Sequence, residues 1–206
     1  MPPSSPKPYL LLAATLLAGG LAAAQSPGGH PHAPANQQNV YLALMDTMMV
    51  KMHEVTEGGS AEAYFIGQMI PHHEGAVAMA DYEIEHGRAS PMVQLAKSIR
   101  AEQTHELQLM RAWLKQASAG RAAGSAGFRQ AMGRSMEVMM QRMPAPAVLT
   151  GTDGAFARVM IPHHQAAIDM ARAVLTIGTD PTIRAFALRI ISSQQVEIEQ
   201  MCSFLK

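Results

Sequence analysis

The chain has 206 residues and carries 16 lysines and arginines against 16 aspartates and glutamates, so its formal net charge at pH 7 is zero. This balance excludes a strongly basic chain overall, and nothing in it suggests binding to nucleic acid or to an anionic membrane. Its 17 methionines outnumber its 5 phenylalanines, 4 tyrosines and single tryptophan taken together. Cys202 is the only cysteine, which excludes an internal disulfide, and we expect it to be a buried apolar residue.

The N-terminus has the pattern of an export signal. Lys7 precedes an apolar run over 9–17 that is too short for a comfortable membrane span, and a small-residue cleavage site ends at Ala24. We therefore expect a signal peptide at 1–24 and a periplasmic or extracellular mature protein with no further membrane segment. An uncleaved anchor is the alternative. Proline and glycine predict a flexible linker over 25–36.

Helical patterns follow in chain order. Residues 37–54 form an amphipathic helix with a face of Tyr41, Met45, Met49 and Met52, bordered by Met48. A second helix spans 61–86 and ends at Gly87, as expected of a C-terminal glycine. A third helix runs over about 90–116, and the small, glycine-rich stretch 117–127 is the natural boundary between two halves.

The second half of the chain repeats the first at a distance of 91 positions. Residues 40–115 align with 131–206 without a gap, and Met69-Ile70-Pro71-His72-His73 recurs as Met160-Ile161-Pro162-His163-His164. A register kept over such a length indicates an internal duplication. No stretch shows the alternation of a strand. We predict one all-α domain of two three-helix repeats, 37–117 and 128–206, whose longer helices form a four-helix bundle beside two methionine-rich helices.

The doubled Pro-His-His motif divides its histidines between two positions on the helix. At about 100° per residue, His73 and His164 fall in the middle of the apolar face. The edge of that face, which an ion can reach, carries His72 and His163 together with Met79 and Met170. We leave a structural and a ligand role both open for the first pair, and favour the ligand role for the second.

The third helix of each repeat places polar side chains in its core stripe, namely Gln103, Glu106, Gln194 and Glu197. Buried amides and carboxylates are costly unless they have hydrogen-bond partners, and the nearest repeated partners are the histidines. We predict that Glu106 and Glu197 hydrogen-bond His73 or His164, within a repeat or across the two. In a metal site such groups orient the imidazoles that bind the ion.

Methionine occupies the same four positions of both first helices: Met45, Met48, Met49 and Met52 recur as Met136, Met139, Met140 and Met143. Leucine would specify a core more uniquely, and thioethers at this spacing can converge on one ion. Soft sulfur with imidazole selects copper(I), and silver(I) is similarly soft. His53 lies four residues after Met49, but its counterpart is Pro144, so the two sites would differ. Plain apolar packing is the alternative for these clusters.

These motifs resemble the domain-of-unknown-function family 305. The resemblance covers about residues 40–206 and rests on Phe-(x)3-Met-Ile-Pro-His-His-(x)2-Ala-(x)2-Met-Ala, followed by Gln-(x)2-Glu-(x)3-Met-(x)2-Trp-Leu. It implies an exported bacterial protein with a ferritin-like helical bundle, and copper or silver binding as the role reported in the family. The motif residues here are Met69, His72, His73 and Met79, and their counterparts Met160, His163, His164 and Met170.

We therefore predict an exported copper(I)- or silver(I)-binding protein that sequesters or chaperones the ion and supports copper tolerance. It would act with a metal-delivery protein as partner and would not be an enzyme. One alternative is a metal-free helical protein with a structural histidine–glutamate network that binds another exported protein. The other is a ferritin-like metallo-oxidase using Glu83, His86, Glu102 and His105, although their counterparts in the second repeat are not ligands.

Overall fold

The computed structural model describes residues 39–56, 59–117 and 125–206, so the predicted signal peptide (1–24) and linker (25–36) lie outside the described residues. The described residues form helices and loops without a strand, which confirms the all-α fold. In chain order the helices are α1 (Val40–His53), α2 (Ala61–His86), α3 (Ser90–Ala117), α4 (Ala126–Gln141), the short 3-10 helix η1 (Pro146–Val148), α5 (Thr152–Ile177) and α6 (Pro181–Phe204). None of these helices combines the length and the hydropathy needed to cross a membrane.

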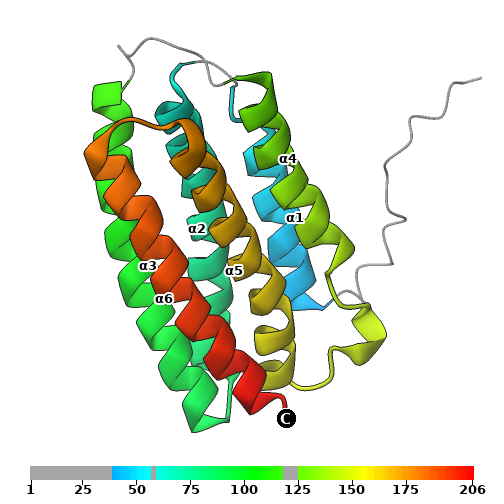
Figure 1. Cartoon of the computed structure of the whole chain (residues 1–206). Helices are drawn as coiled ribbons and strands as arrows, with labels where there is room; N and C mark the ends of the chain where they lie inside the picture. The colour runs from blue at the N-terminus through cyan, green and yellow to red at the C-terminus, as the bar shows by residue number, and fades with distance from the viewer. Residues whose placement is uncertain (1–38, 57–58, 118–124) are drawn as a thin grey trace, which may run out of the picture. The chain divides into compact units, whose positions relative to one another are not determined.

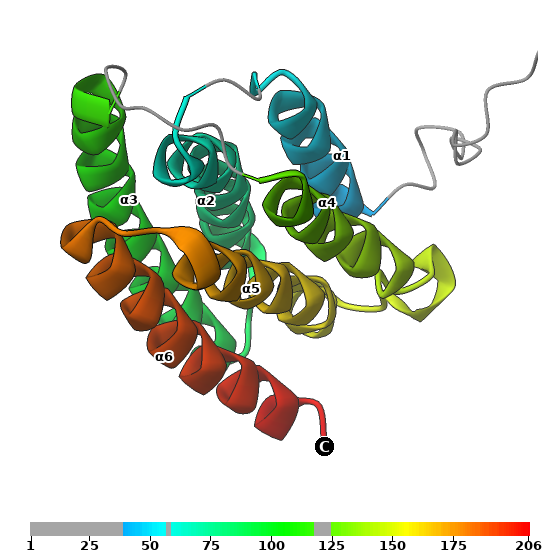
Figure 2. The ribbon, with the colours of Figure 1, turned by 45° about the horizontal axis from the view of Figure 1, so that its top comes forward.

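The internal duplication is visible in the helices themselves. α2 and α5 begin and end 91 residues apart, as the repeat predicts. They pack against each other in the middle, with α3 on α2 and α6 on α5 to one side (Figures 1 and 2). On the other side α1 packs on α2 and α4 packs on α5. The predicted four-helix bundle is therefore α2, α3, α5 and α6, and the methionine-rich helices flank its central pair.

Two acidic side chains at equivalent positions tie the repeats together. Glu62, at the start of α2, accepts a hydrogen bond from the backbone N–H of Thr179, which follows α5, at 2.8 Å. Asp153, at the start of α5, accepts one from the backbone N–H of Ala89, which follows α2, at 2.7 Å. Each repeat thus satisfies backbone donors in a loop of the other, and these contacts fix the relative register of α2 and α5.

Gly87 ends α2 as predicted, but without the left-handed conformation that is common at that position. Its φ of −67° and ψ of 153° are open to any residue. Space is the reason for glycine: a Cβ there would lie 2.5 Å from Glu83 Oε1 and 2.6 Å from the Glu83 carbonyl oxygen. Gly178 closes α5 in the same way, with the Val174 carbonyl oxygen 2.8 Å from the position of a Cβ.

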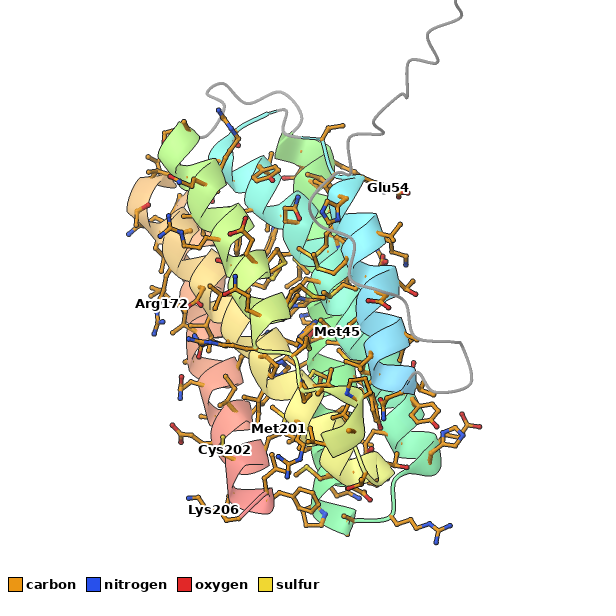
Figure 3. All side chains as sticks on the ribbon, turned by 90° about the vertical axis from the view of Figure 1, so that its right-hand side faces the viewer. Met45, Glu54, Arg172, Met201, Cys202 and Lys206 are labelled. Atoms are coloured by element: carbon orange, nitrogen blue, oxygen red, sulfur yellow. The ribbon has the colours of Figure 1, made fainter. Side chains whose placement is uncertain are left out.

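Cys202 is exposed on α6, and the prediction that it is buried is wrong (Figure 3). The neighbouring Met201 faces the core instead and is fully buried. Successive residues of a helix point about 100° apart, and here Met201 takes the position that faces the core while Cys202 takes the outer one. The lone thiol therefore takes no part in the packing of the core.

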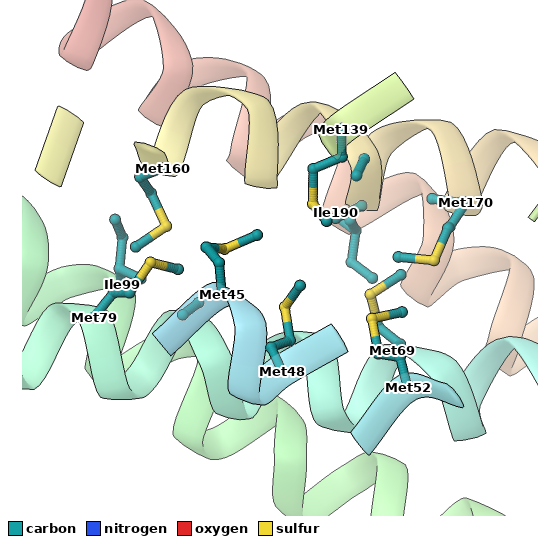
Figure 4. Packing of buried hydrophobic residues seen from close by; sticks show 14 of the residues in the cluster. Met45, Met48, Met52, Met69, Met79, Ile99, Met139, Met160, Met170 and Ile190 are labelled. Atoms are coloured by element: carbon teal, nitrogen blue, oxygen red, sulfur yellow. The ribbon is translucent and has the colours of Figure 1, made fainter. Parts of the chain in front are cut away.

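Methionine fills much of the core between the helices. Figure 4 shows buried methionines of α1 and α2 beside those of α4 and α5 in one cluster, among them Met45, Met48, Met52, Met69, Met79, Met139, Met160 and Met170. Gly75 brings α1 close to α2, because a Cβ at this position would lie 3.0 Å from Met48 Sδ. The buried methionines of α1 and α4 thus cover the side of α2 and α5 that faces away from α3 and α6.

Candidate metal centre

The Pro-His-His motifs lie inside α2 and α5, and all four of their imidazoles are buried. His72, His73, His163 and His164 each have an exposed fraction of 0%. The prediction that His72 and His163 lie at an edge open to an ion is therefore wrong. A helix edge stays open only when no neighbour covers it, and here α2 and α5 pack on each other along the edges that carry these two rings.

The predicted histidine–glutamate hydrogen bonds are confirmed, and each lies within one repeat. Nε2 of His73 is 2.8 Å from Oε2 of Glu106, and Nε2 of His164 is 2.7 Å from Oε2 of Glu197. A carboxylate only accepts hydrogen bonds, so each histidine donates its Nε2–H. In a neutral ring this leaves Nδ1 as a bare acceptor with a free lone pair.

His72 and His163 form a pair across the two repeats. Their ring centroids are 3.7 Å apart with an angle of 30° between the planes, and His163 Nε2–H donates to the His72 backbone carbonyl at 3.1 Å. Burial, and then repulsion from neighbouring histidines, holds the pKa of both rings well below its usual value of 6.5. Both rings are therefore neutral near pH 7, which is the state in which imidazole binds a metal ion.

Five imidazole nitrogens of this cluster are buried without a hydrogen-bond partner among the described residues: both ring nitrogens of His72, and Nδ1 of His73, His163 and His164. Leaving a polar atom in this state costs about 1–3 kcal/mol. A bound ligand would offset that cost. Neutral nitrogen next to thioether sulfur is a soft donor set, and it fits copper(I) or silver(I) better than a hard cation.

The structure divides each predicted methionine cluster between the core and the surface. Met69, Met79, Met160 and Met170 are fully buried on α2 and α5. On α1, Met48 is buried together with Met45 and Met52, whereas Met49 is only half-buried, the reverse of the prediction for Met48 and Met49. In the second repeat Met139 is buried, while Met136, Met140 and Met143 are half-buried. The four sulfur atoms of each cluster therefore do not share one buried face.

Three further residues of the predicted site make no hydrogen bond to the buried histidines. His53 is exposed at the end of α1, and its Nδ1–H donates to the Met49 carbonyl at 2.7 Å. Gln103 and Gln194 are buried, as predicted. However, both amide atoms of Gln103 and the Oε1 atom of Gln194 lack a partner among the described residues. Only the glutamates, and not the glutamines, hold the imidazoles.

The residues of the alternative oxidase site are dispersed. Glu83 is buried beside Asp153, whereas Glu102 lies beside Glu197 between α3 and α6. The two histidines of that set, His86 and His105, are exposed. In the described part of the chain, no three His, Cys, Asp or Glu side chains surround a point where an ion would fit. An ion held by the buried imidazoles therefore also needs thioether ligands or a rotation of the rings.

Access to the buried nitrogens requires helix movement. A surface groove between α4 and α5 is lined by small residues such as Ala131 and Ser135 together with Arg134, Asp169 and Arg172, and by none of the predicted ligands. The imidazole nitrogens themselves are closed to solvent. An ion can reach them only when the helices that cover the cluster separate.

Two polar contacts near the site were missed by reasoning from the sequence. Arg189 donates from Nε and Nη2 to Oε1 of Glu106, at 3.2 and 3.0 Å. The Tyr41 hydroxyl donates to Oε2 of Glu83 at 2.7 Å. Both contacts correspond to breaks in the duplication, since Ser98 is the counterpart of Arg189, and Val174 that of Glu83. A charged residue that occurs in one repeat only, such as Arg189 or Glu83, indicates a hydrogen-bond partner that the other repeat lacks.

Comparison with known proteins gives both a family and solved structures. The sequence matches the family described as Domain of unknown function (DUF305), over residues 17–114 and 62–205. The silver-bound form of CopM, obtained by soaking, is 29% identical with a TM-score of 0.54, covering 69% of this chain and 93% of that chain. CopM in its Cu(I)-bound form is 28% identical with a TM-score of 0.53, covering 69% and 94%. A DUF305 fragment from Deinococcus radiodurans is 25% identical with a TM-score of 0.52, covering 70% and 95%.

A curated relative matches a shorter part of the chain. "Uncharacterized protein L153" of Acanthamoeba polyphaga mimivirus is 43% identical over 53 residues, which are 26% of this chain. The match covers 35% of that protein, so the chain spans about a third of the length of this relative.

Proposed function

The chain belongs to the DUF305 family, and on that premise we propose that it binds a soft metal ion, copper(I) or silver(I), in the interior of its helical bundle. The observation that carries the proposal is the set of buried, unpartnered nitrogens on His72, His73, His163 and His164. CopM, whose solved forms include silver-, Cu(I)- and Cu(II)-bound ones, supports a metal-related role for a chain of this fold.

In this proposal the ligands are neutral. Nδ1 of His73 and His164 would bind the ion while Glu106 and Glu197 hold the opposite side of each ring, the arrangement in which an outer carboxylate fixes the tautomer of a ligand. The His72 imidazole and the buried thioethers of Met69, Met79, Met160 and Met170 would complete the coordination. Neutral nitrogen and sulfur add no charge to a dry interior, so a monovalent ion needs less compensation there than a divalent one.

The ion is cargo in this proposal. Ligands closed to solvent release an ion slowly, which suits sequestration or directed transfer better than turnover of a substrate. We accordingly propose an exported protein that sequesters or chaperones copper, hands it to a metal-delivery protein, supports copper tolerance and catalyses no reaction. N-terminal sequencing of the exported protein, expected to begin at Gln25, tests the export. Copper sensitivity of a strain that lacks the protein tests the tolerance.

A substitution of His72 can distinguish a metal-binding role of its imidazole from a purely structural one. The His72 ring makes no hydrogen bond among the described residues. His72→Leu therefore removes two ring nitrogens at similar side-chain volume and breaks no hydrogen bond. We expect the free energy of unfolding to stay constant or to rise by about 1 kcal/mol, because a buried polar group is replaced by an apolar one. The affinity for silver(I) and copper(I), measured by competition with a chromogenic chelator, should fall at least about tenfold.

The matched control is His105→Leu, which removes an exposed imidazole on α3 and should leave the affinity unchanged. A parent protein that takes up neither ion would refute the proposal. Loss of affinity in His105→Leu with none in His72→Leu would show that surface histidines, and not the buried cluster, bind the ion.

A metal-free helical protein that binds another exported protein is the second candidate. The observation in its favour is the pair of His–Glu hydrogen bonds, which satisfy the Nε2 atoms of His73 and His164 without an ion. In that case His73→Leu would lower the free energy of unfolding, by leaving Glu106 without its histidine, and neither this variant nor His72→Leu would change metal uptake.

A further inference from the structure

Glu106 is held at both oxygens of its carboxylate. Oε2 accepts from His73 Nε2–H at 2.8 Å, and Oε1 accepts from Arg189 through Nε at 3.2 Å and Nη2 at 3.0 Å. Arg189 stands on α6, so the second repeat supplies this contact to the first. Its guanidinium also lies over the ring of Phe186, 5.3 Å from the centroid, and its position is therefore fixed from its own helix as well.

Glu197, the counterpart of Glu106, has no such support. Ser98 stands at the position equivalent to Arg189, and among the described residues the ion pair of Glu197 is with His164 alone. Its charged neighbour from α3 is another acid, Glu102, whose pKa is raised by burial and then by the charges of Glu197 and Glu106. The hydrogen bonds of the two histidine–glutamate pairs are thus nearly equal in length, but only Glu106 also has a hydrogen bond from an arginine.

We propose that Arg189 is a positioning residue, which clamps the carboxylate of Glu106 and thereby makes His73 the more rigidly oriented of the two equivalent histidines. The metal-binding part of this inference rests on the proposed function. A carboxylate that rotates about its last bond carries the hydrogen-bonded ring with it, and the two guanidinium N–H groups that meet at Oε1 oppose that rotation. Ring orientation then decides where the free Nδ1 of His73 points.

The test is Arg189→Gln in the full chain, with nitrogen-15-labelled histidine. Long-range proton–nitrogen NMR spectra report the tautomer and the environment of each ring. We expect the His73 signals to shift or broaden, while those of His164 stay unchanged. Silver(I) affinity should fall about threefold to tenfold, which is less than the 10- to 100-fold typical of losing the orienting partner itself. Arg189→Lys keeps the charge without the planar fork, and we expect an intermediate effect.

The matched control is Arg172→Gln on α5, which removes an exposed arginine that pairs with Asp169 at 3.3 Å (Figure 3). It should change neither the signals of His73 nor the affinity. Equal changes at His73 and His164 in Arg189→Gln, or no change at His73, would overturn the inference. A parent protein that binds no silver would refute the proposed function, and the NMR comparison would still decide whether Arg189 orients His73.

Discussion

Glu83→Gln should stabilise the protein above neutral pH. The Glu83 side chain has an exposed fraction of 0%, and its Oε2 accepts from the Tyr41 hydroxyl at 2.7 Å. The pKa of Glu83 is raised from 4.5 to about 7 by burial first and by the neighbouring Asp153 second, against the lowering effect of the Tyr41 hydrogen bond. The folded chain therefore holds this proton at a pH where the unfolded chain has lost it.

The sign of the pH dependence follows from proton binding. Because the folded state binds the proton more tightly, the contribution of Glu83 to stability is greatest below pH 4.5 and is lost as the pH rises from 4.5 to about 7. At about 1.4 kcal/mol per pKa unit, the loss amounts to about 3 kcal/mol above pH 7. Glutamine resembles the protonated carboxyl and cannot ionise, so the variant should escape this loss.

Urea unfolding of parent and variant, between about pH 5 and about pH 8, measures the effect. The relevant quantity is the difference in the free energy of unfolding between the two proteins, because His72 and His163 titrate in both. This difference should grow by about 2–3 kcal/mol over the range. Glu85→Gln, an exposed acid on the same helix, is the control and should give a flat difference. A flat difference for Glu83→Gln as well would refute the reasoning from burial.

Three further predictions concern the buried histidines and two helix glycines. Because the pKa values of His72 and His163 are lowered, the unfolded chain binds protons below pH 6.5 that the folded chain does not, and acidification should therefore destabilise the parent protein. The double variant His72→Leu/His163→Leu should lose less stability below that pH. Equal losses of stability in the parent and the variant would contradict the burial of neutral rings. Gly75→Ala should cost about 1–2 kcal/mol in urea unfolding because its Cβ would lie 3.0 Å from Met48 Sδ. Gly133→Ala, with no atom within 4 Å of the Cβ, should instead stabilise α4 by about 0.5–1 kcal/mol, and a loss at both positions would argue against the packing explanation.

Much of the fold could be predicted because the same helical pattern of apolar residues occurs in both repeats. The bounds of the helix at 61–86 and the equivalence of its partner 91 residues later follow from the apolar pattern and the register. The pairing of Glu106 with His73 was predictable for a related reason. A carboxylate in the core stripe of a helix needs a hydrogen-bond partner, and the histidines were the nearest polar groups that occur in both repeats.

The exposure of single side chains was not predictable in the same way. A helical projection places His72 at an edge of its own helix, but it contains no information on which neighbour covers that edge. α5 covers it, so the ring is buried. The same limit applies to Met48, for which Gly75 leaves room, and to Cys202, which faces away from the bundle.

Anomalous diffraction from crystals of the silver-loaded protein tests the central claim most directly. We predict a silver peak between α2 and α5, within bonding distance of Nδ1 atoms from the buried histidines and of at least one buried methionine sulfur. Silver found only at exposed imidazoles such as those of His53, His86 and His105, with the buried cluster unchanged, would contradict it.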